Sequence, residues 1–96
     1  MNYEWNEQKR LANLAKHGVD FDEAINFNWS LAWVELDSRY DYNEQRFNAL
    51  APIDNRLYVM TFTRRDEAIR IISFRKANKR EVTYYVSNIE NSAANG

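Results

Sequence analysis

The stretch from residue 57 to residue 74 constrains the fold more than any other part of this chain. Residues 57–63 (LYVMTFT) are rich in aromatic and β-branched side chains, which favour β-strands. Residues 69–74 (IRIISF) repeat this character after a short polar loop. Two such runs so close together predict an antiparallel hairpin. A sheet built on that hairpin needs an apolar cover on one face, which other segments must supply.

Two further strands are predicted before the hairpin. Residues 32–36 (AWVEL) and 46–51 (RFNALA) are separated by a polar connection, 37–43, that contains no glycine or proline. Four consecutive strands with short connections are typical of an antiparallel meander. We therefore expect an α+β domain with a four-stranded antiparallel sheet.

Two helices are predicted before the sheet. The first begins after Asn6, a good capping residue, and ends at Gly18, which suits a left-handed C-terminal cap. The second, residues 21–27, follows a capping box formed by Asp20 and Glu23. A third helix follows the sheet, so the expected order is ααββββα.

The last helix starts at another capping box, Asn78 with Glu81. Its apolar stripe has the spacing i, i+3, i+4, i+7 and consists of Val82, Tyr85, Val86 and Ile89. With 96 residues the chain is expected to form one domain, 1–90, followed by a small polar tail, 91–96, that we expect to be flexible.

Composition argues against several classes of function. The chain has no cysteine, so it can form neither disulfides nor thiolate metal sites. One histidine without clustered acids cannot make a closed zinc site, and no Gly-rich phosphate loop occurs, so we expect no metal and no cofactor. The start lacks a signal-peptide pattern and no apolar run reaches transmembrane length, which predicts a cytoplasmic protein without a membrane partner.

Positive charge is concentrated in one part of the sequence. Residues 1–63 carry six Lys or Arg against ten Asp or Glu, whereas residues 64–80 carry seven against two. Lys79 and Arg80 fall in the predicted first turn of the last helix, where cations oppose the helix dipole, and Arg75 lies shortly before them. A solvated basic face is the simpler interpretation. The alternative is that these cations bind phosphates together with the free N–H groups of the helix start, which suggests nucleic acid.

A set of short motifs, in its order and spacing, resembles the BrnT family of bacterial type II toxins. The motifs are KHGV at 16–19 with Phe21 and Ala24, Glu44-x-Arg46, and RIIS at 70–73 followed by Arg75, Ala77 and Glu81. The resemblance implies a fold similar to RelE-type toxins, ribonuclease activity that arrests translation, and neutralisation by a BrnA-like antitoxin with a ribbon-helix-helix DNA-binding domain. Operator DNA is then bound only through the antitoxin, in a complex that could contain a toxin dimer.

Two residues depart from the usual family pattern. Phe74 stands where alanine is usual, and Ala51 where a glycine commonly closes the second strand. We expect a large ring beside Arg75 to shift the arginine or to narrow the site.

Cleavage of RNA through its own 2′-hydroxyl needs a base, an acid and cations that stabilise the charged phosphorane. The predicted catalytic residues are His17, Glu44, Arg70 and Arg75, and the predicted RNA phosphate ligands are Lys16, Arg46, Lys76, Lys79 and Arg80. Tyr84 and Tyr85 are further acid–base candidates. His17 titrates in a suitable range, although a helix-capping histidine explains it equally well, and Glu44 with Arg46 could form a simple surface ion pair.

Alternation along the strand raises a difficulty for Arg70 and Arg75. The two residues are an odd number apart, so on an unbroken strand they point to opposite faces. We expect the strand to end near Phe74, which would leave Arg75 at the rim of the sheet beside Lys76. The three tryptophans, Trp5, Trp29 and Trp33, are expected in the core.

The favoured interpretation is a metal-independent ribonuclease toxin. The alternative is a catalytically silent module that binds the antitoxin and acts as a co-repressor. Direct recognition of operator DNA finds no support, because no groove-reading motif is present.

Overall fold

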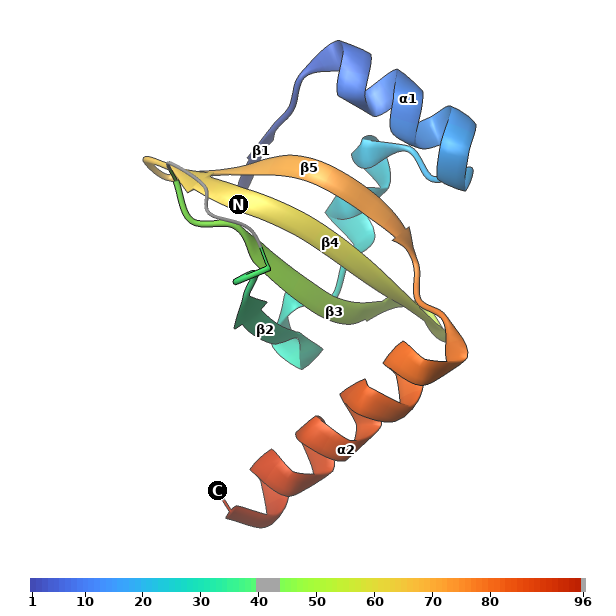
Figure 1. Ribbon diagram of the computed structural model, residues 1–96, viewed down its shortest axis with the longest axis vertical. Coiled ribbons are helices and arrows are strands. Elements are labelled where there is room, and N and C mark those ends of the chain that lie inside the picture. Colours follow the sequence, from blue (N-terminus) through green and yellow to red (C-terminus); the bar gives the residue numbers. More distant parts are fainter. Residues whose placement is uncertain (40–43, 96) are drawn as a thin grey trace.

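The computed structural model of the chain describes residues 1–39 and 44–95. It is an α+β domain in which one mixed sheet is covered on one face (Figure 1). The elements in chain order are β1 (Asn2–Glu4), α1 (Glu7–His17), the 3₁₀ helices η1 (Phe21–Asn26) and η2 (Trp29–Leu31), β2 (Trp33–Leu36), β3 (Phe47–Ile53), β4 (Arg56–Arg65), β5 (Ala68–Lys76) and α2 (Lys79–Asn95).

The prediction of a four-stranded antiparallel sheet was wrong. The sheet has five strands in the order β1-β5-β4-β3-β2, and β1 lies parallel to β5. Strands β2 to β5 do form the expected antiparallel meander. Strand β1 was missed because its three residues are too few to show a period, and its partner lies at the other end of the sequence.

The predicted order ααββββα was also wrong, because a strand precedes the first helix and the segment after it is not α-helical. Residues Phe21–Asn26 form a 3₁₀ helix instead. The side chain of Asp20 accepts a hydrogen bond from the backbone N–H of Asp22 rather than from Glu23, which tightens the turn. Six residues are too few to favour an α-helix once that tight turn has formed.

Both ends of α1 and the start of α2 follow the prediction. Asn6 accepts a hydrogen bond from Lys9 N, and Gly18 adopts the left-handed conformation at φ 71° with its N–H bonded to Leu14 O. Asn78 and Glu81 form the reciprocal capping box, with both hydrogen bonds at 2.9 Å. Helix α2 continues to Asn95, and the flexibility of the tail stays a prediction.

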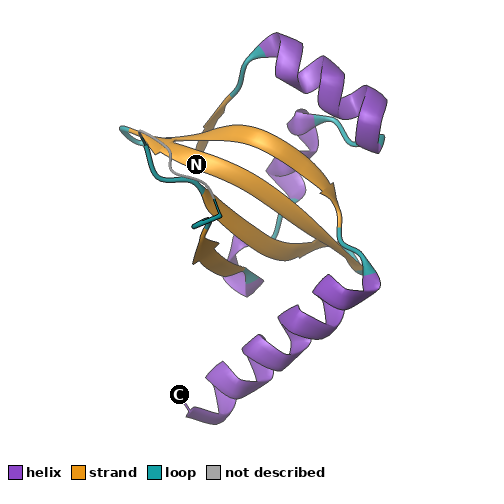
Figure 2. Ribbon diagram, viewed as in Figure 1, coloured by secondary structure: helices purple, strands orange, loops and turns teal. Residues whose placement is uncertain are grey.

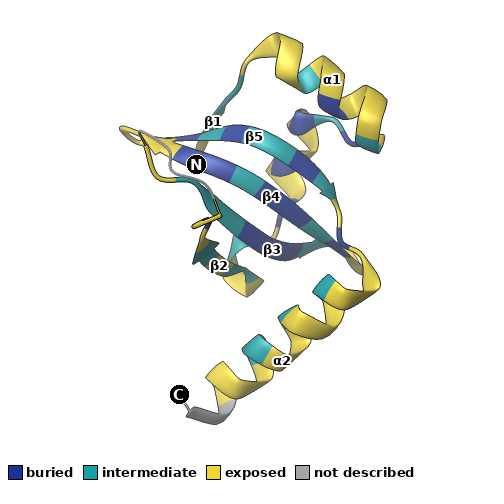
Figure 3. Ribbon diagram, in the orientation of Figure 1, coloured by how far each residue is buried: buried dark blue, intermediate teal, exposed yellow. Residues whose placement is uncertain are grey.

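The main core lies on one face of the sheet, beneath α1, η1 and η2 (Figures 2 and 3). Its fully buried side chains include Phe21, Met60, Phe62 and Phe74, and Trp5 and Trp29 pack around them. On the opposite face a small cluster of Leu50, Leu57, Val59 and Ala77 packs against Tyr85 of α2. The rest of this second face, toward β5 and α1, is polar and open. None of the helices in the described part of the chain is long and apolar enough to cross a membrane.

A β-bulge in β5 resolves the difficulty of alternation. Thr61 pairs with Ser73 but Phe62 pairs with Ile71, so Ile72 is the extra residue. Beyond the bulge, Phe74 faces Met60 in the core, whereas Arg75 lies opposite Val59 on the open face. Strand β5 also runs to Lys76, so the expectation that it ends near Phe74 was wrong.

Candidate active site

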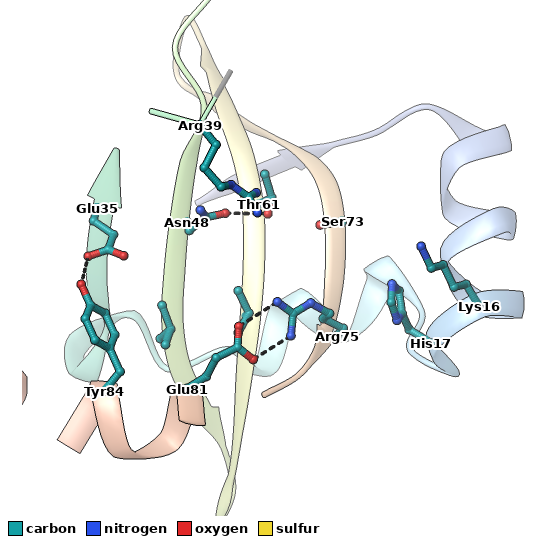
Figure 4. A pocket seen from close by; sticks show the side chains of 12 residues that line it. Lys16, His17, Glu35, Arg39, Asn48, Thr61, Ser73, Arg75, Glu81 and Tyr84 are labelled. Carbon is teal, nitrogen blue, oxygen red and sulfur yellow. Dashed lines mark hydrogen bonds and ion pairs between the residues drawn. The ribbon is translucent and has the colours of Figure 1, made fainter. Parts of the chain in front are cut away.

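A cleft of about 470 Å³ occupies the open face of the sheet (Figure 4). Four strands form its floor, and its ends are closed by the C-terminal end of α1 and the first turns of α2. The lining residues are Lys16, His17, Glu35, Arg39, Asn48, Leu50, Val59, Thr61, Ser73, Arg75, Glu81 and Tyr84. Segments far apart in the sequence therefore meet at one polar surface.

Asn13 fixes the end of α1 that carries Lys16 and His17. Its side-chain amide is buried and donates to Phe74 O at 2.7 Å and to Val19 O at 3.0 Å. Its carbonyl oxygen accepts from Phe74 N at 3.1 Å. Asn13 thus provides hydrogen-bond partners for the N–H and the carbonyl of Phe74 on the side of β5 where no strand pairs with them. These bonds also set the position of α1 relative to the cleft.

The bulge in β5 delivers Ser73 and Arg75 to the floor of the cleft. Arg75 donates two hydrogen bonds to the carboxylate of Glu81, each 2.8 Å long. The pKa of Glu81 is lowered and that of Arg75 is raised, in both cases mainly by this bidentate pair. Since Glu81 is also the capping-box residue of α2, the same carboxylate joins the start of the helix to the cleft.

His17 lies at the α1 end of the cleft, on the side where β5 carries Arg75. Its pKa lies below the ordinary value, first because partial burial disfavours the charged ring and then because Lys16 and Arg75 repel a further positive charge. A lowered pKa leaves the imidazole neutral near pH 7. A neutral imidazole among cations can accept a proton, which is what a general base must do.

The opposite end of the cleft is built from β2 and α2. Tyr84 donates a 2.5 Å hydrogen bond to Glu35, which raises the pKa of the tyrosine. In the middle, Thr61 donates to the side chain of Asn48 at 2.7 Å. Arg39 enters from the loop after β2 and is paired with the buried Asp37 at 3.0 Å.

The structure brings together three of the nine predicted site residues in the cleft: Lys16, His17 and Arg75. Arg70 pairs with Thr63, which lies on the same face of β4 as Thr61, so Arg70 belongs to the open face. It lies outside the cleft lining, however, and its side chain contacts Glu4 at 3.4 Å. The other five also lie outside that lining. Glu44 pairs with Arg65 at 3.1 Å.

The remaining predicted phosphate ligands lie outside the cleft, at two places. Arg46 precedes β3, and its backbone carbonyl accepts from Asp37 N at 2.8 Å. Lys76, Lys79 and Arg80 are exposed around the start of α2, where Lys79 borders a separate, more apolar hollow. Their roles as phosphate ligands stay predictions.

Several lining residues had no clear signal in the sequence. Arg39 lies in the polar connection, where nothing distinguishes it from its neighbours. Glu35 could have been found, because a charged residue shares a strand face with Trp33 in the predicted strand 32–36. Trp33 itself pairs with Leu50 on the cleft face, so the expectation that it lies in the core was wrong.

The two departures from the family pattern do not touch the cleft. The ring of Phe74 is fully buried in the main core, where it packs edge-on against Phe27 at 5.6 Å and also contacts Tyr58. It points away from Arg75, so the expected narrowing of the site was wrong. Ala51 is likewise buried in the core, and β3 continues past it to Ile53.

The fold and the cleft together define a small α+β domain that presents a histidine and several cations on an open sheet face, an arrangement suited to a phosphate-bearing substrate. Residues 5–81 match the family model of BrnT, the ribonuclease toxin of type II toxin–antitoxin systems, and the chain belongs to this family. The resemblance inferred from the motifs is thereby confirmed. No curated protein matches the chain. Within residues 1–39 and 44–95, no three His, Cys, Asp or Glu side chains gather as a metal site.

Proposed function

We propose that the protein is an endoribonuclease toxin, that the cleft is its active site, and that cleavage needs no metal ion. The observation that carries the proposal is that His17, Lys16 and Arg75 line the same end of one cleft. The imidazole would take the proton of the RNA 2′-hydroxyl as its oxygen bonds to phosphorus, and the bond to the 5′-oxygen would break with a proton supplied to that oxygen by the imidazolium or by water. The two cations would stabilise the negative charge that develops on the phosphate.

The pairing of Arg75 with Glu81 is compatible with this role. The carboxylate occupies one edge of the guanidinium, through Nη1 and Nη2. A guanidinium carries five N–H donors, so its Nε side can still reach a phosphate oxygen. Glu81 would then hold the guanidinium of Arg75 in place while the substrate binds. Ser73 and Thr61 would offer hydroxyl groups from the strands that form the floor of the cleft.

In the cell we expect cleavage of RNA in the cytoplasm to arrest translation. A BrnA-like antitoxin with a ribbon-helix-helix domain would neutralise the toxin and would carry the complex to operator DNA. The support for an antitoxin partner is membership of a type II toxin family. Restoration of growth when the antitoxin is expressed together with the toxin is the expected result.

The test compares the purified wild type with His17→Ala and Arg75→Ala on single-stranded RNA in the presence of EDTA. Loss of a general base typically lowers the rate by about 10²–10⁴-fold, and we expect losses in this range for His17→Ala. Arg56→Ala removes an exposed arginine outside the cleft and is the matched control. A 2′-deoxy substitution at the cleaved position should abolish cleavage. If both cleft variants fold and cleave at the wild-type rate, the proposed site is wrong.

One observation favours the alternative of a catalytically silent, antitoxin-binding co-repressor. Arg75 already donates two short hydrogen bonds to Glu81, as a purely structural arginine would. A folded wild type that binds its antitoxin but cleaves no RNA, with or without added metal, would establish this alternative.

A further inference from the structure

The β2 end of the cleft is separated by two strands from the strand that carries Arg75. Glu35 lies on β2 and Arg75 on β5, and two strands separate them in the sheet. Three strand spacings amount to roughly 14 Å, several times the ~3.4 Å repeat of a stacked nucleic-acid strand. The two ends of the cleft therefore meet different parts of any bound strand (Figure 4).

The carboxylate of Glu35 is held in place but retains an acceptor. Tyr84 Oη and Trp33 Nε1 both donate to its Oε2 atom, at 2.5 and 3.2 Å. In the described part of the chain no donor reaches Oε1. Tyr84 is 44% exposed, and its side chain lines the cleft next to this carboxylate.

Asn48 places a hydrogen-bond donor next to that acceptor. It lies directly opposite Glu35 in the β2–β3 ladder, where facing Cβ atoms are about 4.5–5.5 Å apart. Its Oδ1 atom accepts from Thr61 Oγ1 at 2.7 Å. Its amide nitrogen has no partner among the residues that the structure describes. The cleft thus shows an acceptor and a donor on neighbouring strands, next to an aromatic ring whose hydroxyl contacts the same carboxylate.

We propose that Glu35, Asn48 and Tyr84 form a nucleobase subsite, an inference that rests on RNA being the substrate of the cleft. The ring of Tyr84 stacks on an unpaired base, as aromatic side chains do in single-stranded RNA recognition. Glu35 Oε1 accepts from an exocyclic amino group, and Asn48 Nδ2 donates to the adjacent ring nitrogen or carbonyl oxygen.

The subsite selects bases that carry an amino group and rejects uracil. The N3–H of uracil lies between two carbonyl oxygens, and a carboxylate that approaches this N–H is repelled by both. Cytosine presents its amino group next to the unprotonated N3, which matches the acceptor and donor of Glu35 and Asn48. Tyr84 lies beyond residue 81, where the match to the BrnT family ends, so family membership does not account for the stacking residue of this subsite.

The test measures binding of 2′-O-methyl tetranucleotides, which lack the 2′-hydroxyl and are not cleaved. Fluorescence anisotropy gives the affinities for the C₄ and U₄ sequences, which are both pyrimidines and differ little in stacking. One well-placed hydrogen-bonded pair discriminates by about 5- to 150-fold, and we expect the wild type to prefer C₄ by about tenfold.

Glu35→Gln presents an amide donor in place of the carboxylate, so the ratio of the two affinities should fall to about one or invert. The ratio is the readout because loss of a negative charge raises the affinity for both oligonucleotides. Tyr84→Phe retains the ring and should retain the preference, whereas Tyr84→Ala should weaken binding of both by about tenfold. Glu23→Gln, an exposed carboxylate on η1 outside the cleft, is the matched control and should match the wild type.

Equal wild-type affinities for C₄ and U₄, or a preference that survives in Glu35→Gln, would overturn the proposal. Failure of every oligonucleotide to bind would overturn it as well. Because these oligonucleotides cannot be cleaved, a chain that fails to cut RNA but shows the expected preference refutes only the catalytic proposal.

Discussion

Replacement of Asn13 by alanine is the perturbation for which the structure predicts the largest effect outside the aromatic core. The side chain makes three hydrogen bonds, all to the backbone of residues that are themselves buried: Val19 and Phe74. Alanine would leave one N–H and two carbonyl oxygens without their partners. Each unsatisfied buried group costs about 1–3 kcal/mol, and the carbonyls cost less when water reaches them.

We therefore expect Asn13→Ala to lower the free energy of unfolding by about 3 kcal/mol, a large share of the 5–15 kcal/mol typical of a domain. For a domain of this size the melting temperature should fall by about 12–24 °C. Urea denaturation followed by circular dichroism measures the first quantity, and thermal denaturation the second. Asn26→Ala removes an exposed asparagine from η1 and should change stability by no more than about 0.5 kcal/mol.

The same variant also tests how α1 is positioned. If Asn13 sets the place of His17, RNA cleavage by Asn13→Ala should fall further than the loss of folded protein accounts for. Asn13→Asp sharpens the comparison, because the carboxylate can still accept from Phe74 N but faces two carbonyl oxygens. It should therefore be at least as unstable as the alanine variant at pH 7. A loss below about 1 kcal/mol in Asn13→Ala would refute the reasoning, since it would mean that the three backbone groups find other partners.

Three further predictions concern the cleft. The pKa of His17 is lowered from 6.5, so proton NMR of this single imidazole should show a midpoint below 6.5, and Arg75→Ala should raise it. The folded state disfavours the protonated ring, so the contribution of His17 to the free energy of unfolding is complete above pH 6.5 and is lost as the pH falls toward the folded-state pKa. An NMR midpoint at or above 6.5 would contradict the electrostatic picture. Glu81→Gln should lower the free energy of unfolding by no more than about 1 kcal/mol, since the ion pair is partly exposed. The same substitution should tighten the binding of an uncleavable RNA, because it removes a negative charge beside Arg75. Unchanged affinity would show that Arg75 does not contact phosphate. Phe74→Ala should destabilise the fold by about 3–5 kcal/mol, while the protein that remains folded at low temperature cleaves RNA normally, and selective loss of cleavage would show that the ring shapes the site.

The parts of the fold that local chemistry determines could be predicted from the sequence. Helix α1 is bounded by Asn6 and Gly18, and each of these residues performs the capping that its type favours. The four predicted strands also exist, because alternation and β-branched residues are local signals. Strand β1 has no such signal. It exists because β5 offers a free edge at residues 68–70, and that edge lies at the other end of the sequence.

The candidate site was harder to predict because charge density along the sequence is a poor guide to proximity in space. Lys79 and Arg80 belong to the densest basic segment, yet neither lines the cleft. Lys16 and His17 come from an acidic half of the sequence and reach the cleft only because α1 is fastened to β5. The position of Arg75 depended on the bulge at Ile72, and two consecutive isoleucines give no indication of which residue leaves the ladder.

Phe74 explains how these features act together. Its side chain is buried in the core, and its backbone N–H and carbonyl both form hydrogen bonds with the side chain of Asn13. The next residue, Arg75, lines the cleft. The bulge is what makes this combination available, since a regular ladder would exchange the faces of residues 74 and 75. The hydrogen bonds to Asn13 and the direction of Arg75 depend on the backbone of residue 74 and not on the side chain of that residue. An aromatic ring therefore fits at this position without reaching the cleft, because the core beneath η1 and η2 has room for its edge-on contact with Phe27.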